Sequence, residues 1–207
     1  MRMLLKHVLN AAFAALILCS CVDEHGQDGH VTKHKFSVSV ADGSVADSLC
    51  LAFDGDVAVS GGAEPLKISK GKAEGMVAEA EEYYAAYPAE AFQYFSPDDP
   101  SSVTMRLPVV QTAVKGSIPE GTDLAVASTS SDEMSFEFGD MLSYIRFSIT
   151  EEAGKLRSIS LISTYGERIS GDFAVSCLDE DREVFPMPSS ASNVSLTPSG
   201  EYFEPGE

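Results

Sequence analysis

The feature that most constrains the fold is a period-two alternation of apolar and polar residues, repeated in short runs after residue 35. Successive side chains of a β-strand point to opposite faces of a sheet, so each run offers one apolar and one polar face. Turn-forming pairs such as Asp42-Gly43 and Ser170-Gly171 separate the runs. The alternating apolar residues are Phe36, Val38 and Val40; Val103, Met105 and Leu107; Met134, Phe136 and Phe138; Ile145, Phe147 and Ile149; and Ile159 and Leu161. This pattern predicts an all-β chain built as an antiparallel β-sandwich.

The same pattern predicts how the chain divides. We expect residues 36–130 to form a first β-sandwich domain and residues 131–207 to begin a second one that is incomplete, because a new strand pattern at 194–196 is followed at once by the last residues. Two short stretches, around 73–82 and 89–95, have a helical pattern. The residues predicted to lie in the core are Phe36, Val38, Tyr84, Leu107, Val126, Phe136, Ile145, Phe147, Ile159 and Leu161.

The N-terminal segment, residues 1–20, is built like a secretion signal. Arg2 and Lys6 precede an apolar run from 8 to 18. That run is much shorter than the roughly 20 residues that a membrane-spanning helix needs. A small residue, Ser20, directly precedes Cys21, as in the lipobox of bacterial lipoproteins. We therefore predict that Cys21 is lipidated, by palmitate or a similar acyl chain, and becomes the new N-terminus. An ordinary signal peptide is the alternative.

Residues 21–35 read as an acidic tether, which resembles the export signal of surface-exposed lipoproteins in some Gram-negative anaerobes. Removal of residues 1–20 leaves 12 basic and 32 acidic side chains, a net charge of −20. So acidic a surface repels phosphate backbones, and we expect no nucleic-acid partner. It also repels anionic lipid, which leaves the acyl chain as the contact with the outer membrane.

Two further cysteines, Cys50 and Cys177, lie in strand-like runs. An exported chain meets oxidising conditions, so a disulfide between them is one reading. Two separate buried thiols are the other, because cysteine also serves as a small core residue.

The sequence gives little support to catalysis. His25, His30 and His34 lie in or near the tether, which supplies no fixed metal geometry, and no nucleophile-elbow, Walker or zinc-protease motif occurs. Acidic turns at 54–56, 98–99 and 179–181 offer oxygen atoms to calcium but read better as solvated turns. We therefore expect no enzyme activity, no cofactor and no metal. Four tyrosines could stack on sugars or pack in a core: Tyr83, Tyr84, Tyr87 and Tyr94.

The middle of the chain carries a series of short motifs in a characteristic order. They are Tyr83-Tyr84-Ala85-Ala86-Tyr87-Pro88; Val103-Thr104-Met105-Arg106-Leu107-Pro108 with Gln111-Thr112; Asp123-Leu124-Ala125-Val126-Ala127-Ser128; residues 134–150, with Leu142-Ser143-Tyr144-Ile145-Arg146-Phe147-Ser148-Ile149-Thr150; and Ile159-Ser160-Leu161 with Ile169-Ser170-Gly171. In this order, over residues 66–176, they resemble the fimbrillin family, the subunits of fimbriae on Gram-negative anaerobes.

The resemblance implies transthyretin-like β-sandwich domains and packing of Tyr83, Tyr84 and Tyr87 in a core strand. It also implies assembly with other fimbrial subunits by β-strand exchange. In polymerising members an arginine-directed protease removes the first strand, but no arginine lies between Arg2 and Arg106 here. The expectation is therefore a fimbrillin-like lipoprotein at the cell surface, in an anchor, tip or accessory role, with host or bacterial surface molecules as further ligands. The alternative is a solitary glycan-binding surface lipoprotein.

Overall fold

The computed structural model describes residues 33–41, 43–45, 49–51, 53, 55–150, 154–178 and 183–204. Residues 31–207 form one compact unit. Its described residues are all-β and contain no helix, so none of them forms a helix long and apolar enough to cross a membrane. The all-β prediction is confirmed.

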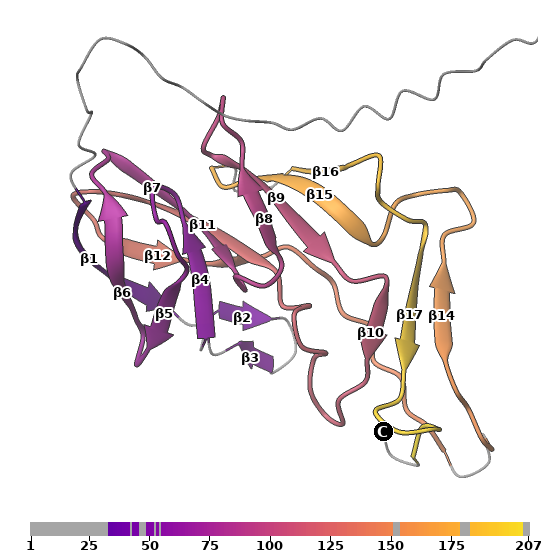
Figure 1. The fold of residues 1–207 in the computed structure, drawn as a ribbon. Coiled ribbons are helices and arrows are strands. Elements are labelled where there is room, and N and C mark those ends of the chain that lie inside the picture. The colour runs from indigo at the N-terminus through magenta and orange to yellow at the C-terminus, as the bar shows by residue number, and fades with distance from the viewer. Residues whose placement is uncertain are drawn as a thin grey trace, which may run out of the picture. The chain divides into compact units, whose positions relative to one another are not determined.

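The strands form four sheets (Figure 1). The eight-stranded sheet has the order β12 (Ser135–Glu137), β1 (Lys33–Ala41), β6 (Lys72–Ala78), β5 (Leu66–Ser69), β4 (Gly55–Val59), β7 (Glu82–Tyr87), β11 (Ala125–Ser130) and β13 (Gly139–Asp140). The four-stranded sheet is β16 (Val184–Pro186), β15 (Gly171–Ser176), β9 (Ser102–Leu107) and β8 (Phe92–Phe95). The three-stranded sheet is β10 (Val110–Thr112), β17 (Asn193–Thr197) and β14 (Ile159–Ile162), and β2 (Gly43–Val45) pairs with β3 (Leu49–Leu51).

The eight-stranded sheet changes partners at β4. Gly55, Asp56 and Val57 pair with β5, whereas Ala58 and Val59 pair with β7. Aromatic side chains from both halves of this sheet meet in one core. Phe36 and Tyr83 have ring centroids 4.7 Å apart, and Phe53 lies 5.0 Å from Tyr87 and 4.8 Å from Phe138. Such tilted and edge-on contacts add to the burial of large apolar surfaces.

Strands β4, β7 and β11 are buried on both faces. In β7, Tyr83, Ala85 and Tyr87 belong to the aromatic core, while Ala86 belongs to a second core. The second core is completed by the four-stranded sheet, through Val103, Met105, Leu107, Phe173, Val175 and Cys177. This explains why β7 reads as a continuous apolar run from Tyr83 to Tyr87 and not as an alternation: both of its faces pack against a core. The small alanines let the two layers approach this middle layer.

The predicted helical stretches are wrong. Residues 72–78 form β6, which pairs with β1 over seven positions from Lys33↔Ala78 to Ser39↔Lys72. Residues 92–95 form β8, which pairs with β9. Alanine and glutamate favour helices only weakly, and the ladder and the burial of Ala73 and Val77 outweigh that preference.

The predicted core is correct in part. Phe36, Val38, Leu107, Val126 and Phe136 are buried, and Tyr84 and Ile159 are half-buried. The prediction is wrong for three residues, which are largely exposed: Ile145 (61%), Phe147 (39%) and Leu161 (43%). Residues 141–150 form no strand despite their alternation, so no sheet presents Ile145 and Phe147 to a core.

Sheet pairing also runs across position 130, the predicted end of the first domain. β12 follows that position and pairs in parallel with β1, while β15 pairs with β9 over six positions. The division of the chain at residue 130 stays a prediction.

Candidate interaction surface

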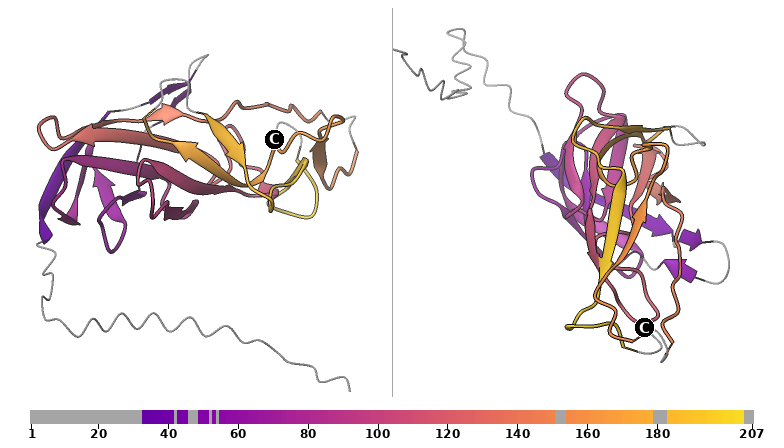
Figure 2. Two further views of the ribbon diagram at one scale, coloured as in Figure 1. Left: turned by 90° about the horizontal axis from the view of Figure 1, so that it is seen from above. Right: turned by 90° about the vertical axis from the view of Figure 1, so that its right-hand side faces the viewer.

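The three-stranded sheet has one apolar face that is incompletely covered. Ile159 pairs with Leu196 and Leu161 with Val194, so these four side chains share a face. Leu161 is 43% exposed and the other three are half-buried. Every residue of β17 is half-buried, in contrast to the fully buried positions of β9 in the second core. The apolar face of this sheet is therefore only partly shielded from water. Figure 2 shows it at the end of the unit that carries the C-terminus.

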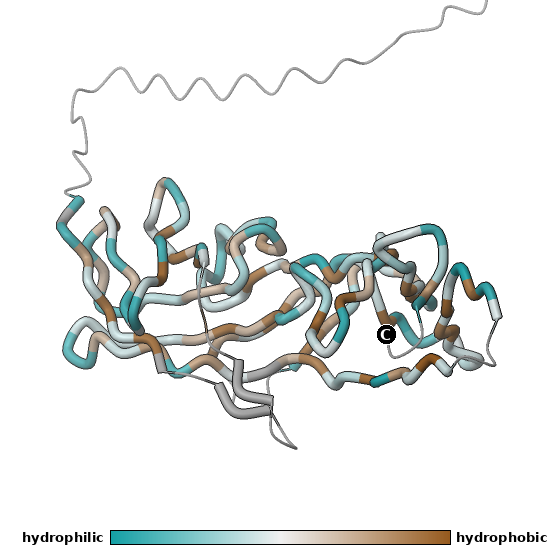
Figure 3. The backbone as a smooth tube through the Cα atoms, turned by 90° about the horizontal axis from the view of Figure 1, so that it is seen from below, coloured by the Kyte–Doolittle hydropathy of each residue, from teal (hydrophilic) through white to brown (hydrophobic). Residues whose placement is uncertain are grey.

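Other exposed large apolar side chains belong to the strands of this sheet or to segments near them in the sequence. They are Val110, Tyr144, Ile145, Phe147, Ile162 and Tyr165. Figure 3 shows apolar stretches at the same end of the unit as the C-terminus. Single exposed apolar residues are ordinary, whereas a contiguous patch of them marks a surface used for binding. Met141 and Leu142 pack against the second core, and we call the apolar face of the three-stranded sheet together with residues 143–150 the open region.

Two cations lie in the segment just before β14, on an otherwise acidic chain. Arg157 donates a hydrogen bond to Glu201 at 3.2 Å and another to the Tyr202 hydroxyl at 2.9 Å. The guanidinium of Arg157 and the ammonium of Lys155 each lie 5.1 Å from the centre of the Tyr202 ring. The Phe203 N–H donates to the Leu156 carbonyl, so these contacts attach the last described residues to the start of β14.

A second ion pair joins two strands of the four-stranded sheet. Arg106 on β9 donates to both carboxylate oxygens of Asp172 on β15, at 2.6 Å and 3.1 Å. Ser189 donates to the same carboxylate, and the Ser190 hydroxyl donates to the Asp172 carbonyl. Hydrogen bonding to Arg106 holds the pKa of the Asp172 carboxyl below its usual range. This contact fastens residues 189–190 to the sheet and is structural.

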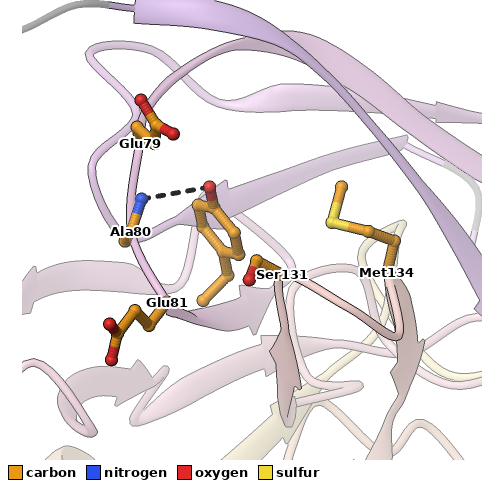
Figure 4. A pocket seen from close by; sticks show the side chains of 6 residues that line it. Glu79, Ala80, Glu81, Ser131 and Met134 are labelled. Atoms are coloured by element: carbon orange, nitrogen blue, oxygen red, sulfur yellow. Dashed lines mark hydrogen bonds between the residues drawn. The ribbon is translucent and has the colours of Figure 1, made fainter.

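A shallow pocket of about 450 Å³ lies beside β7, lined by Glu79, Ala80, Glu81, Tyr83, Ser131 and Met134 (Figure 4). The Ala80 N–H donates to the Tyr83 hydroxyl at 3.2 Å, so the hydroxyl stabilises the turn before β7. The lining contains two carboxylates, Glu79 and Glu81, and no imidazole, thiol or cation.

Asp123 has an unusual environment at the start of β11. Burial raises the pKa of its carboxyl, while a hydrogen bond from the Tyr87 side chain works in the opposite direction. The Tyr87 ring belongs to the aromatic core, so Asp123 ties the end of β7 to the segment before β11.

The predicted lipid site, Cys21, lies outside the described residues, as do the side chains of His25, His30 and His34. Cys177 is buried at 4% exposure in the second core, and the side chain of Cys50 is outside the described part, so their pairing stays a prediction. Within the described ranges no group of three or more His, Cys, Asp or Glu side chains is arranged to hold a metal.

Two further sequence interpretations can be compared with the structure. The packing of Tyr83 and Tyr87 is confirmed, since both are buried, whereas Tyr94 is 47% exposed. Asp99 accepts hydrogen bonds from the N–H and the hydroxyl of Ser101, a contact that is typical of a turn. Sequence reasoning missed the open region, because alternation reports an apolar face and not what covers it.

Comparison with family models, with curated proteins and with solved structures found no match to this chain.

Proposed function

We propose that this chain is a fimbrillin-like lipoprotein of the cell surface, a structural or adhesive subunit of fimbriae held on the outer membrane by a lipid at Cys21. The observation that supports this most is the open region, where strand-patterned residues leave Ile145, Phe147 and Leu161 exposed. A protein that acts alone would gain from burying them. A protein that receives a strand from a neighbour would keep such a surface available.

The chemistry of that contact is β-augmentation. An incoming strand satisfies the backbone groups of an open sheet edge, and its alternate side chains fill apolar positions on one face. In this proposal the incoming strand comes from another fimbrial subunit and completes a transthyretin-like sandwich around the open region. The exposed apolar side chains then become its core.

An anchor, tip or accessory position fits better than a place in the shaft. Strand β1 is paired on both sides, with β12 and with β6, and its Phe36 and Val38 are buried in the aromatic core. Removal of this strand would expose that core. Arginine-directed removal also lacks a site here, because no arginine lies between Arg2 and Arg106.

The first test is the substitution Cys21→Ala in the full chain. We expect the wild type to incorporate labelled fatty acid, to pellet with membranes and to be cut by protease added to intact cells. Cys21→Ala should lose the label and leave the outer membrane, while Cys19→Ala should retain both properties. Unmodified Cys21 within a soluble wild-type chain would contradict the lipoprotein part of the proposal.

The fimbrial part needs its own readout. Fimbriae sheared from cells that make the wild-type chain should contain the chain, in complexes that resist mild denaturation. A lipidated chain that never accompanies fimbriae would refute assembly and leave the anchor standing.

The alternative, a solitary glycan-binding lipoprotein, is favoured by a different observation. Tyr165 is 90% exposed and Tyr94 is 47% exposed, and exposed aromatic faces are the usual stacking partners of sugar rings. If this function is correct, Tyr165→Ala should abolish saccharide-dependent binding of whole cells. Lys155→Ala, on the other side of β14 in the sequence, should leave it unchanged.

A further inference from the structure

The outer edge of β14 is the edge of the three-stranded sheet most suited to pairing with another strand. β17 lies in the middle of that sheet, so β14 has a partner on one side only in the described part of the chain (Figure 1). Residues 158–164 contain no charge, no proline and no glycine. Edge strands are normally protected by such residues or by bulges. β14 has none of these protections.

The backbone of β14 can be oriented from its contacts. The Ser163 N–H donates to the Ser192 carbonyl, so it points toward β17. The Ser195 N–H, opposite Ser160, donates to the Val109 carbonyl on the far side of β17. Backbone groups alternate in direction along an antiparallel strand. The N–H and C=O groups of Ser158, Ser160 and Ile162 therefore point away from β17, toward the open edge.

We propose that this edge binds a second copy of the same chain, related by a two-fold axis through Ser160, with the two β14 strands antiparallel. In this register Ser160 faces Ser160 of the other copy, and Ser158 faces Ile162. These are the residues whose backbone groups point outward, so each facing pair exchanges two hydrogen bonds. The sheets join into a continuous sheet across the axis.

The side chains fit the same register. Ile159 faces Leu161 of the other copy, and both belong to the apolar face that is incompletely covered. A non-hydrogen-bonded pair brings such side chains closest together. The partner strand thus covers the part of the apolar face beside the edge. A register shifted by one residue would place apolar side chains against the serines of the opposite face.

Charge complementarity favours a second copy over an unrelated strand. In this register Arg157 faces Ser163 of the other copy, and the Ser163 hydroxyl donates to the carboxylate of Glu167. In the dimer each Arg157 exchanges its exposed contact with Glu201 for the Glu167 carboxylate of the other copy, and the two-fold axis forms this pair twice. No like charges face each other along the strand. A contact of this kind ends with a dimer and does not continue into a filament, because it uses the same surface on both copies.

The proposal goes beyond the proposed function and does not rest on it, since the contact needs neither a lipid nor a fimbria. The test is sedimentation of the purified full chain in mild detergent, over a range of concentrations. Ser160→Lys places two lysines opposite each other at the axis, and we expect the dissociation constant to rise about tenfold or more. Ser195→Lys is the matched control. It adds the same charge and removes the same hydrogen bond between the Ser160 and Ser195 hydroxyls, but on the inner strand. It should leave the dissociation constant within about twofold.

Two further measurements locate the contact. Arg157→Glu should weaken the dimer, and the combined change Arg157→Glu with Glu167→Arg should restore it. Hydrogen exchange of the Ser160 and Ile162 amides should slow as concentration rises, while the inward amides of Ile159 and Leu161 should not change. A wild-type chain that stays monomeric at about 100 μM would overturn the proposal. So would a dimer equally affected by both lysine variants, and so would protection of Ser160 that is independent of concentration, which would mean that a segment of the same chain covers the edge.

Discussion

Two strands of this chain, β1 and β14, carry the same alternation of apolar and polar residues. The apolar face of β1 is buried, whereas that of β14 is partly exposed. In β1, Phe36 and Val38 alternate with serine and are 0% and 1% exposed. In β14, Ile159 and Leu161 also alternate with serine, yet Leu161 is 43% exposed. The difference lies in their neighbours. β1 pairs on both sides and faces aromatic side chains from the opposite half of the sheet, whereas β14 is an edge strand whose face has no complete layer against it. Alternation determines which side of a strand is apolar, and the rest of the fold determines whether that side is buried.

The largest expected effect comes from replacing phenylalanine by alanine at a buried and at an exposed position. Phe36→Ala should lower the free energy of unfolding by about 3–5 kcal/mol, because it empties a position between Tyr83 and Phe136. Phe147→Ala should lower it by less than about 0.5 kcal/mol, since the side chain is 39% exposed on a segment without strand structure. Denaturant unfolding of the two variants measures both values. Equal losses would mean that the Phe147 ring is packed in solution as closely as that of Phe36.

Two glycines allow a similar comparison between a packed and an open position of the backbone. Gly171 (φ 94°) and Gly166 (φ 81°) both have a left-handed backbone that disfavours any side chain. A methyl group on Gly171 would lie 2.7 Å from the Ser190 Cα, whereas one on Gly166 would meet nothing within 4 Å. We expect Gly166→Ala to cost about 1 kcal/mol of stability and Gly171→Ala about 2–4 kcal/mol, since only the latter also clashes with backbone. Thermal unfolding midpoints should rank the variants in that order.

The two ion pairs provide a smaller test, with a pH dependence. The Asp172 carboxylate is 15% exposed on the side chain, and Arg157 and Glu201 are 69% and 71% exposed. Asp172→Asn should therefore cost about 1 kcal/mol at pH 7, and Glu201→Gln almost nothing. Because folding lowers the pKa of Asp172, its contribution is complete above the unfolded carboxyl's pKa of about 4 and is lost as the pH falls through the lower folded value. The wild type and Asp172→Asn should become equally stable in strong acid. A difference that persists there would mean that Asp172 acts through packing.

Much of this protein followed from local sequence. Phe36, Val38, Leu107, Val126 and Phe136 lie in the core because strand side chains alternate and the apolar set must leave water. The all-β class followed from the same rule. The strand conformation of residues 72–78 and 92–95 did not follow from local sequence, because alanine and glutamate have only a weak intrinsic preference for helices. Pairing with β1 and β9, which lie far away in the sequence or beyond a turn, decided their conformation.

The candidate surface shows most clearly what only the tertiary structure decided. The sequence determined that Ile145, Phe147, Ile159 and Leu161 are apolar, that their neighbours are polar, and that residues 158–164 carry no charge. It could not determine that the first two residues lie on a segment without a sheet, or that the edge of β14 faces outward. Those properties depend on which strands pair. Pairing in turn depends on all the strand edges of the folded chain and not on one segment alone. β17 pairs with both β10 and β14, so the outer edge of β14 pairs with no other strand among the described residues.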